Sequence, residues 1–124
     1  MQKLYSSIFS ANAIILGSPI YMGQISGQTK IFIDRLYAEF HPRFSPQFKE
    51  ENGGKKLALV FTQGNPDKTI FETYYNYTKT MFQKLEFDVL NPLIIATGTR
   101  SIPVSENNEL LFQTTRLGRL LCGL

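Results

Sequence analysis

Three short apolar runs recur along the chain, and each is followed by turn-forming residues and then by an amphipathic pattern. The runs are Ala13–Leu16, Leu57–Phe61 and Leu93–Ala96. Each is too short for a free-standing helix, and a continuous apolar run of this length is typical of a strand buried on both faces. The cluster Gly17-Ser18-Pro19 is expected to end the first strand and turn the chain.

Helical periodicity predicts the elements between these strands. Residues 2–10 form a short first helix, and a second helix runs from an N-cap at Ser26 to about Phe40. A long third helix follows Asp67, which is interpreted as its cap, and a last helix opens at Pro103 and Ser105. The buried stripe of the third helix is predicted to be Ile70, Phe71, Tyr74, Thr78, Met81, Phe82 and Leu85, with Tyr75 and Tyr77 off it.

Strands that alternate with helices predict an α/β fold. We expect one domain over residues 1–124, with a three-stranded parallel sheet in chain order and helices on both faces. The loops after such strands meet at one edge, where ligands bind. That edge collects residues 18–24, 62–65 and 97–100, whose groups are mostly hydroxyl, amide and aromatic. They are suited to hold a polar planar ligand and to leave the chemistry to that ligand.

Composition narrows the function classes. The 124 residues are 43% hydrophobic and 19% charged, with a net charge of +3, as in an ordinary globular domain. The basic residues form no run, so no nucleic acid is expected as a partner. No stretch approaches the length of a membrane span, and residues 1–10 are too polar for a secretory signal. No membrane association is expected, and the cytoplasm is the expected location.

Two single residues limit the chemistry further. Cys122 is the one cysteine, which excludes an intrachain disulfide and an all-cysteine cluster; its leucine neighbours suggest a buried, inert thiol. His41 is the one histidine and lies in residues 41–54, a segment with two prolines and a Gly-Gly pair that is interpreted as a lid or mobile insertion. No metal site is predicted.

The central loop also carries a resemblance. Gly17-Ser18-Pro19-Ile20-Tyr21-Met22-Gly23, followed by Ser26–Lys30 and Phe32–Arg35, resembles the NADPH-dependent FMN reductase and multimeric flavodoxin branch of the flavodoxin-like superfamily. In that family the Ser-Pro-x-Tyr loop lies along FMN, with NAD(P)H as electron donor and a small molecule as acceptor. The residues for which the resemblance implies FMN contact are Ser18, Pro19, Ile20, Tyr21, Met22, Gly23, Thr62, Gln63 and Gly64.

The chain also departs from this family. Its members begin with a strand, a phosphate-binding loop, a helix and a second strand, and roughly 50–60 residues of this kind are not matched here. In the strand order 2-1-3-4-5, the absent strands would leave Ala13–Leu16 at an edge. An apolar edge recruits other chains. A homo-oligomer joined near this edge, or an N-terminal segment covering it, is therefore expected.

Three functions remain open at this point. The first is an FMN-binding, NAD(P)H-dependent oxidoreductase of the flavin or quinone reductase type, in an N-terminally truncated form. The second is a non-catalytic flavodoxin-like interaction module that binds a partner through the open sheet edge. The third is a flavodoxin-like electron carrier, which the basic charge disfavours because such carriers are usually acidic.

Overall fold

The computed structural model describes residues 2–40, 50 and 53–124, without the side chains of residues 2 and 38–40. The segment interpreted as a lid, with His41, falls largely outside the described residues. The elements are α1 (Gln2–Ser10), β1 (Ala13–Tyr21), β2 (Gln24–Ile25), α2 (Gly27–Phe40), β3 (Lys56–Thr62), α4 (Glu72–Lys84), β4 (Asp88–Val89), β5 (Ile94–Ala96), η1 (Val104–Glu106) and α5 (Asn108–Cys122).

The sheet has the parallel core that the sequence predicts. β1 pairs in parallel with β3, from Ala13 opposite Lys56 to Pro19 opposite Thr62. β5 pairs in parallel with the end of β3, whereas the short β4, which was not predicted, pairs with its start. A second unpredicted strand, β2, pairs antiparallel with the end of β1. The strand order is β2-β1-β3-β4, with β5 also on β3.

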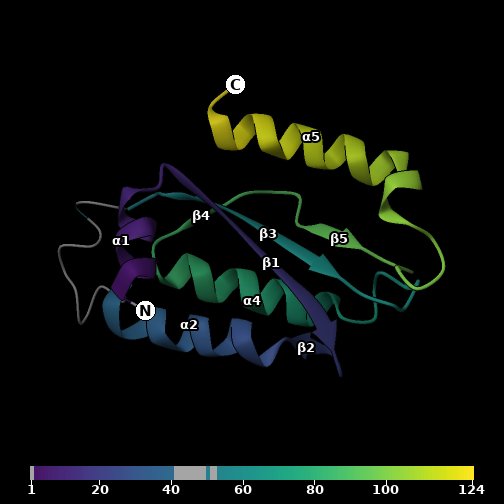
Figure 1. Cartoon of the computed structure of the whole chain (residues 1–124), viewed down its shortest axis with the longest axis horizontal. Helices are drawn as coiled ribbons and strands as arrows, with labels where there is room; N and C mark the ends of the chain where they lie inside the picture. Colours follow the sequence, from purple (N-terminus) through teal and green to yellow (C-terminus); the bar gives the residue numbers. More distant parts are fainter. Residues whose placement is uncertain (1, 41–49, 51–52) are drawn as a thin grey trace.

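Helices cover both faces, as predicted (Figure 1). Side chains alternate along β3, so Leu57, Leu59 and Phe61 face α1, α2 and α4, whereas Ala58 and Val60 face α5. The first cluster also contains Ile8, Leu36, Tyr75 and Phe82, and the second contains Ile94, Ala96, Leu110 and Leu117. β3 is therefore the strand that both layers share.

β1 is longer and more exposed than predicted. Gly17-Ser18-Pro19 does not end the strand but continues the ladder opposite residues 60–62. A proline is tolerated there because β1 is an edge strand over this stretch, so one row of its backbone groups has no strand partner among the described residues. The prediction of burial on both faces is also wrong, since Ile15 is 66% exposed while Ile20 is buried.

The predicted helix caps have mixed outcomes. The Ser26 Oγ accepts a hydrogen bond from the Thr29 N–H at 3.3 Å, which confirms the N-cap of α2. The prediction for Asp67 is wrong: its carboxylate accepts from the Thr69 N–H and hydroxyl, in a turn that precedes Glu72, the first residue of α4. The carboxylate satisfies a local turn, because the chain is not yet helical there.

The last helix also starts later than predicted. Asn107 caps α5, since its side chain accepts from the Leu110 N–H at 3.0 Å. Residues 104–106, where the helix was expected to open, form the separate 3₁₀ turn η1.

Besides Ile70, which was expected in the buried stripe of α4 yet is 53% exposed ahead of that helix, two further side chains are placed differently from their prediction. Tyr75 was expected off the buried stripe of α4, yet it is 1% exposed and stacks on Phe61 with ring centroids 4.7 Å apart. Cys122 was expected to be buried, yet it is exposed at the end of α5. Both differences arise because the surface that a helix buries depends on how it crosses the sheet.

Two adjacent lysines at the start of β3 hold helix ends on opposite faces. The Lys55 ammonium donates to the carbonyls of Ile8 and Phe9, near the end of α1. The Lys56 ammonium donates to the Leu120 carbonyl, near the end of α5. Lys55 satisfies carbonyls that the end of α1 leaves without a helical partner, whereas Lys56 adds a second donor to the Leu120 carbonyl, which also accepts from the Gly123 N–H at 3.2 Å. Partial burial lowers the pKa of Lys55.

No helix among the described residues is both long and apolar enough to cross a membrane.

Candidate functional site

The β1–β2 hairpin presents a strained turn at the carboxyl end of β1. Tyr21 and Gln24 are paired, so Met22 and Gly23 are the two turn residues, with φ values of 50° and 79°. Positive φ at both positions matches the right-handed twist of a hairpin. Glycine adopts this conformation freely, but methionine adopts it at a cost. Met22 is fully exposed, so no packing within the described residues compensates for the cost.

Two side chains hold this hairpin in place. The Tyr74 hydroxyl accepts a hydrogen bond from the Ile25 N–H at 3.3 Å, which ties β2 to α4. Ser18 is buried, and its Oγ accepts from the Ser26 N–H at 3.1 Å and the Thr29 hydroxyl at 3.2 Å. The Ser18 side chain therefore braces the start of α2.

Gln63 organises the loop after β3. Its side chain is 2% exposed; the amide Nε2 donates to the carbonyls of Asn65 and Asp67, both at 2.8 Å, and its Oε1 accepts from the Tyr75 hydroxyl. Its backbone N–H donates to Ala96 O at 2.8 Å. Burial raises the pKa of the Tyr75 phenol, so this donor keeps its proton at neutral pH. We interpret Gln63 as the residue that fixes the shape of the loop.

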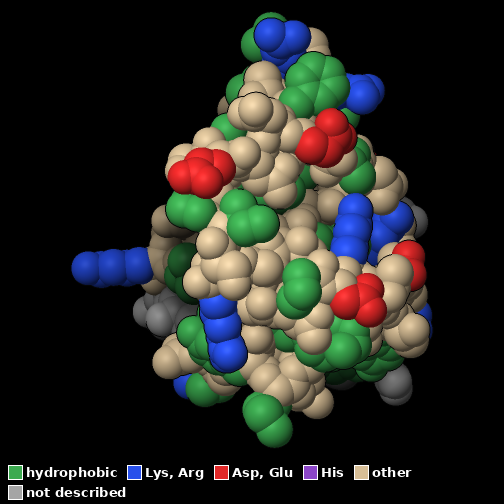
Figure 2. Space-filling view, turned by 90° about the vertical axis from the view of Figure 1, so that its right-hand side faces the viewer, with side chains coloured by type: hydrophobic (Ala, Val, Ile, Leu, Met, Phe, Trp, Pro, Cys, Tyr) green, Lys and Arg blue, Asp and Glu red, His purple; other side chains and the backbone are tan. Residues whose placement is uncertain are grey.

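A cavity of about 290 Å³ lies where these loops meet, at the carboxyl ends of β1 and β3. It is lined by Ile20, Met22, Gly23, Gln63, Gly64, Asn65, Phe71 and Arg100. In the view onto this end of the molecule, polar surface surrounds separate hydrophobic patches (Figure 2). Its volume is at the lower end of the roughly 300–1,000 Å³ typical of ligand pockets, which suits one part of a ligand rather than a whole one.

The cavity brings together some of the nine predicted contact residues. Ile20, Met22, Gly23, Gln63 and Gly64 line it, so the two predicted segments do meet. Ser18, Pro19, Tyr21 and Thr62 do not line it, and the Tyr21 side chain is 65% exposed. Flavin contact by all nine residues stays a prediction.

Sequence reasoning assigned no role to three lining residues. Phe71 was placed in the core stripe of α4, yet it lies before that helix, with its ring against Gly23. Asn65 and Arg100 were placed at the ligand-binding edge without a function. Arg100 is the one charged side chain among the described residues that line the cavity. The signal available in the sequence was this single charge within an otherwise neutral set of loops.

The lining fits a planar ring system with polar edges. Ile20 and Phe71 supply apolar surface, and the missing side chains at Gly23 and Gly64 allow the Phe71 ring to pack against Gly23 and the Arg100 side chain to pack over Gly64. A Cβ added at Gly64 would lie 2.8 Å from the Arg100 Nε, so there is no free space for a side chain at this position. These features suit the isoalloxazine ring of FMN, and the described lining offers no carboxylate, histidine or thiol that would react itself.

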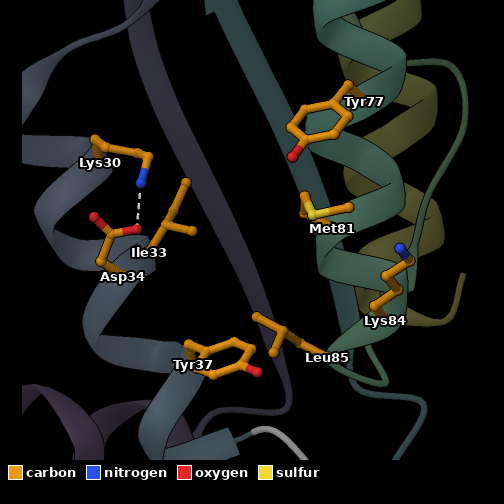
Figure 3. Close-up of a pocket in the computed structure, with 8 residues that line it drawn as sticks. All are labelled: Lys30, Ile33, Asp34, Tyr37, Tyr77, Met81, Lys84 and Leu85. Atoms are coloured by element: carbon orange, nitrogen blue, oxygen red, sulfur yellow. Dashed lines mark hydrogen bonds and ion pairs between the residues drawn. The ribbon is translucent and has the colours of Figure 1, made fainter.

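A larger cavity lies elsewhere, on the helical face between α2 and α4. It measures about 410 Å³; its side chains come from the two facing helices, and Lys30 and Asp34 form an ion pair on one wall (Figure 3). Its described lining contains none of the loop residues that follow β1, β3 and β5, and it is at such loops that ligands of parallel sheets bind. We therefore assign the smaller cavity as the candidate site. Within the described part of the chain, no group of three or more potential metal ligands was found.

A parallel sheet with helices on both faces and a cavity at the carboxyl ends of two adjacent strands is the architecture of doubly wound α/β proteins, the class to which flavodoxin-like proteins belong. Two solved structures share this fold. One is an NADPH-quinone reductase from P. pentosaceus, with a TM-score of 0.68 and 16% identity over 90% of this chain and 69% of that chain. The other is the Trp repressor binding protein from Bacillus subtilis, with a TM-score of 0.63 and 22% identity over 97% of this chain and 72% of that chain.

The sequence gives the family. Residues 1–74, more than half of the chain, match the NADPH-dependent FMN reductase family, and the chain belongs to it. An iron–sulfur flavoprotein of Methanocaldococcus jannaschii is 37% identical over 38 residues, which are 31% of this chain and 19% of that protein. The predicted resemblance is thereby confirmed, and FMN with NAD(P)H as donor agrees with the description of this family.

Proposed function

We propose that the chain is an FMN-binding, NAD(P)H-dependent oxidoreductase that reduces a small-molecule acceptor such as a quinone or a free flavin. The cavity at the ends of β1 and β3 carries this proposal, because it joins the two segments that the family resemblance assigns to the flavin. Bound FMN would supply the hydride- and electron-transfer chemistry, and the residues that line the cavity would hold it. The cytoplasmic location expected from the sequence is part of the proposal.

The residues of this chain bind and orient rather than react. Phe71 and Ile20 shield one side of the cavity from water, and Met22 reaches out from the turn, where its thioether can pack on an aromatic ring. Backbone groups of the turn at Met22 and Gly23 would bind the polar edge of a ring. The Gln63–Tyr75 hydrogen bond keeps the β3 loop in the shape that forms the cavity.

Flavin titration of the purified chain tests the proposal. Saturable FMN binding is expected, followed as bound flavin absorbance, together with NAD(P)H oxidation in the presence of a quinone. Tyr21→Ala and Gly23→Val should weaken FMN binding. Tyr77→Ala is the matched control, because Tyr77 is 59% exposed on α4 and does not line the candidate cavity. Unchanged FMN affinity in both test variants would contradict the site assignment, and absence of any FMN binding would contradict the function.

A homo-oligomer joined at β1 is proposed alongside this activity. Beyond β2, the described residues give β1 no strand partner on its outer side, and Ile15 is exposed on the face that α5 leaves uncovered. An apolar strand at a sheet edge is a template for pairing with another chain. The open edge of β1 also supports the second candidate function, an interaction module. Sedimentation of the flavin-free protein would detect association of this kind.

A further inference from the structure

We propose that Arg100 is a phosphate anchor at the rim of the flavin cavity, and that it binds a phosphate group of the nicotinamide dinucleotide. This inference rests on the proposed function, and it adds a residue for the donor rather than for the flavin. It would make Arg100 a binding residue for the electron donor.

The first observation is that the Arg100 guanidinium has no partner of its own. It makes no hydrogen bond or ion pair with any residue that the structure describes, although it is exposed beside a cavity whose other described lining is uncharged. An arginine with no carboxylate nearby is available to an anion from solution. Its planar fork matches two oxygens of a phosphate at once.

The second observation is that the structure directs this side chain across the cavity. The Nε, Cδ and Cγ atoms of Arg100 lie within 2.8–3.2 Å of where a Cβ of residue 64 would be, so the side chain passes directly over Gly64. Any larger residue at position 64 would push it aside. The absence of a side chain at Gly64 is thus what allows Arg100 to reach the cavity.

The third observation is that the turn carrying Arg100 is fixed to the loop after β3. The Thr99 N–H and hydroxyl both donate to Gln63 O, at 3.3 and 3.2 Å, and the Gly98 N–H donates to Asn65 O at 3.2 Å. The Ser101 N–H closes the turn onto Gly98 O at 2.9 Å. The backbone of Arg100 is therefore held by the residues that shape the cavity, even though its side chain is at the surface.

These observations favour the dinucleotide as the source of the phosphate. Both FMN and NAD(P)H carry phosphate, but a substrate that arrives after the cofactor must be captured from the exposed rim, where Arg100 lies. Arg100 follows β5, which pairs with β3 on the side opposite β1. It is thus separated from the open β1 edge by the cavity itself. The pyrophosphate of the donor offers more oxygens to a guanidinium than a single phosphate does.

The test measures dinucleotide binding first and turnover second. The chain is reconstituted with FMN and titrated with NADP⁺ and NAD⁺, and KM and kcat are measured with NADPH and NADH. Arg100→Gln should raise the dinucleotide Kd and KM about tenfold, with kcat little changed, as expected for losing one exposed charge-assisted contact. Arg100→Lys should lose less, because it keeps the charge but not the fork. Arg116→Gln on α5 is the control with the same change in net charge, and it should leave binding unchanged.

Three further results decide the source of the phosphate and separate this inference from the function. FMN and riboflavin affinities should both be unaffected by Arg100→Gln; a loss for FMN but not riboflavin would assign Arg100 to the flavin and overturn the proposal. Unchanged dinucleotide binding would also overturn it. If the chain binds no FMN, the proposed function fails, and titration of the apoprotein with inorganic pyrophosphate decides the anchor, which stands if Arg100→Gln weakens that binding and falls if it does not.

Discussion

Replacing Met22 by glycine should stabilise the protein, which is unusual for a residue at a binding site. Met22 has φ of 50° and is fully exposed, so the change removes backbone strain and sacrifices no buried surface. A left-handed conformation costs a non-glycine residue about 1–2 kcal/mol. The greater conformational freedom of glycine in the unfolded chain lowers the free energy of unfolding by about 0.4–1 kcal/mol, which offsets part of this gain. The expected net gain is about 0.5–1 kcal/mol.

Urea denaturation of the apoprotein measures this gain. The midpoint should rise without a change in slope, and the melting temperature should rise by about 2–4 °C. Met22→Ala is the matched control: it removes the thioether but keeps the Cβ and its strain, so its stability should stay within about 0.5 kcal/mol of the wild type. Both variants should weaken FMN binding equally if the thioether packs on the ring. Loss of stability in Met22→Gly, or an equal gain in Met22→Ala, would refute the reasoning.

Three other variants test further parts of the structure. Gly23→Val places a branched side chain at a φ of 79° and should cost about 1–3 kcal/mol of folding stability in the same denaturation assay. Tyr75→Phe leaves the buried Gln63 amide oxygen without its donor and should cost about 1–3 kcal/mol. Burial raises the pKa of Tyr75 above its ordinary value of 10.0. The stabilisation that the buried neutral phenol gives the folded protein is therefore fully present below pH 10.0 and is lost as the pH rises further. The alkaline decline in stability should therefore be shallower in the variant, and equal slopes would contradict the burial argument. Ile15→Lys should reduce self-association in sedimentation velocity, whereas Ile70→Lys, also at an exposed isoleucine, should not; equal association in all three proteins would contradict pairing at β1.

Local signals predicted the parts of the fold that depend on neighbouring residues. The three parallel strands, the α1 range and the Ser26 cap all follow from patterns within a few residues, and the structure has them. Gly17-Ser18-Pro19 was misjudged because pairing with β3 overrides the turn preference of those residues. A cluster of turn formers does not reveal whether a partner strand will extend past it.

In the candidate site, too, local patterns predicted some residues, whereas contacts between distant residues were missed. Residues 20–23 and 63–64 were predicted from the loop pattern and the resemblance, and they meet at the cavity. Arg100 was seen to lie at the right edge, but its path over Gly64 joins residues 36 positions apart and leaves no local pattern. Ser18 was predicted to face the ligand, yet its hydroxyl turns inward to α2, because the strand continues through it and fixes which face it occupies.

Two adjacent lysines, Lys55 just before β3 and Lys56 at its first position, have a consequence for how the molecule unfolds. Lys55 binds the end of α1 and Lys56 binds the end of α5, so two helices on opposite faces of the sheet are both attached where β3 begins. Displacing the start of β3 would break the contacts to α1 and to α5 at the same time. We therefore expect the amides of α1 and α5 to become accessible to hydrogen exchange in a common opening event rather than as independent units. The two hydrophobic clusters on opposite faces of the sheet would then unfold together, as a single cooperative unit.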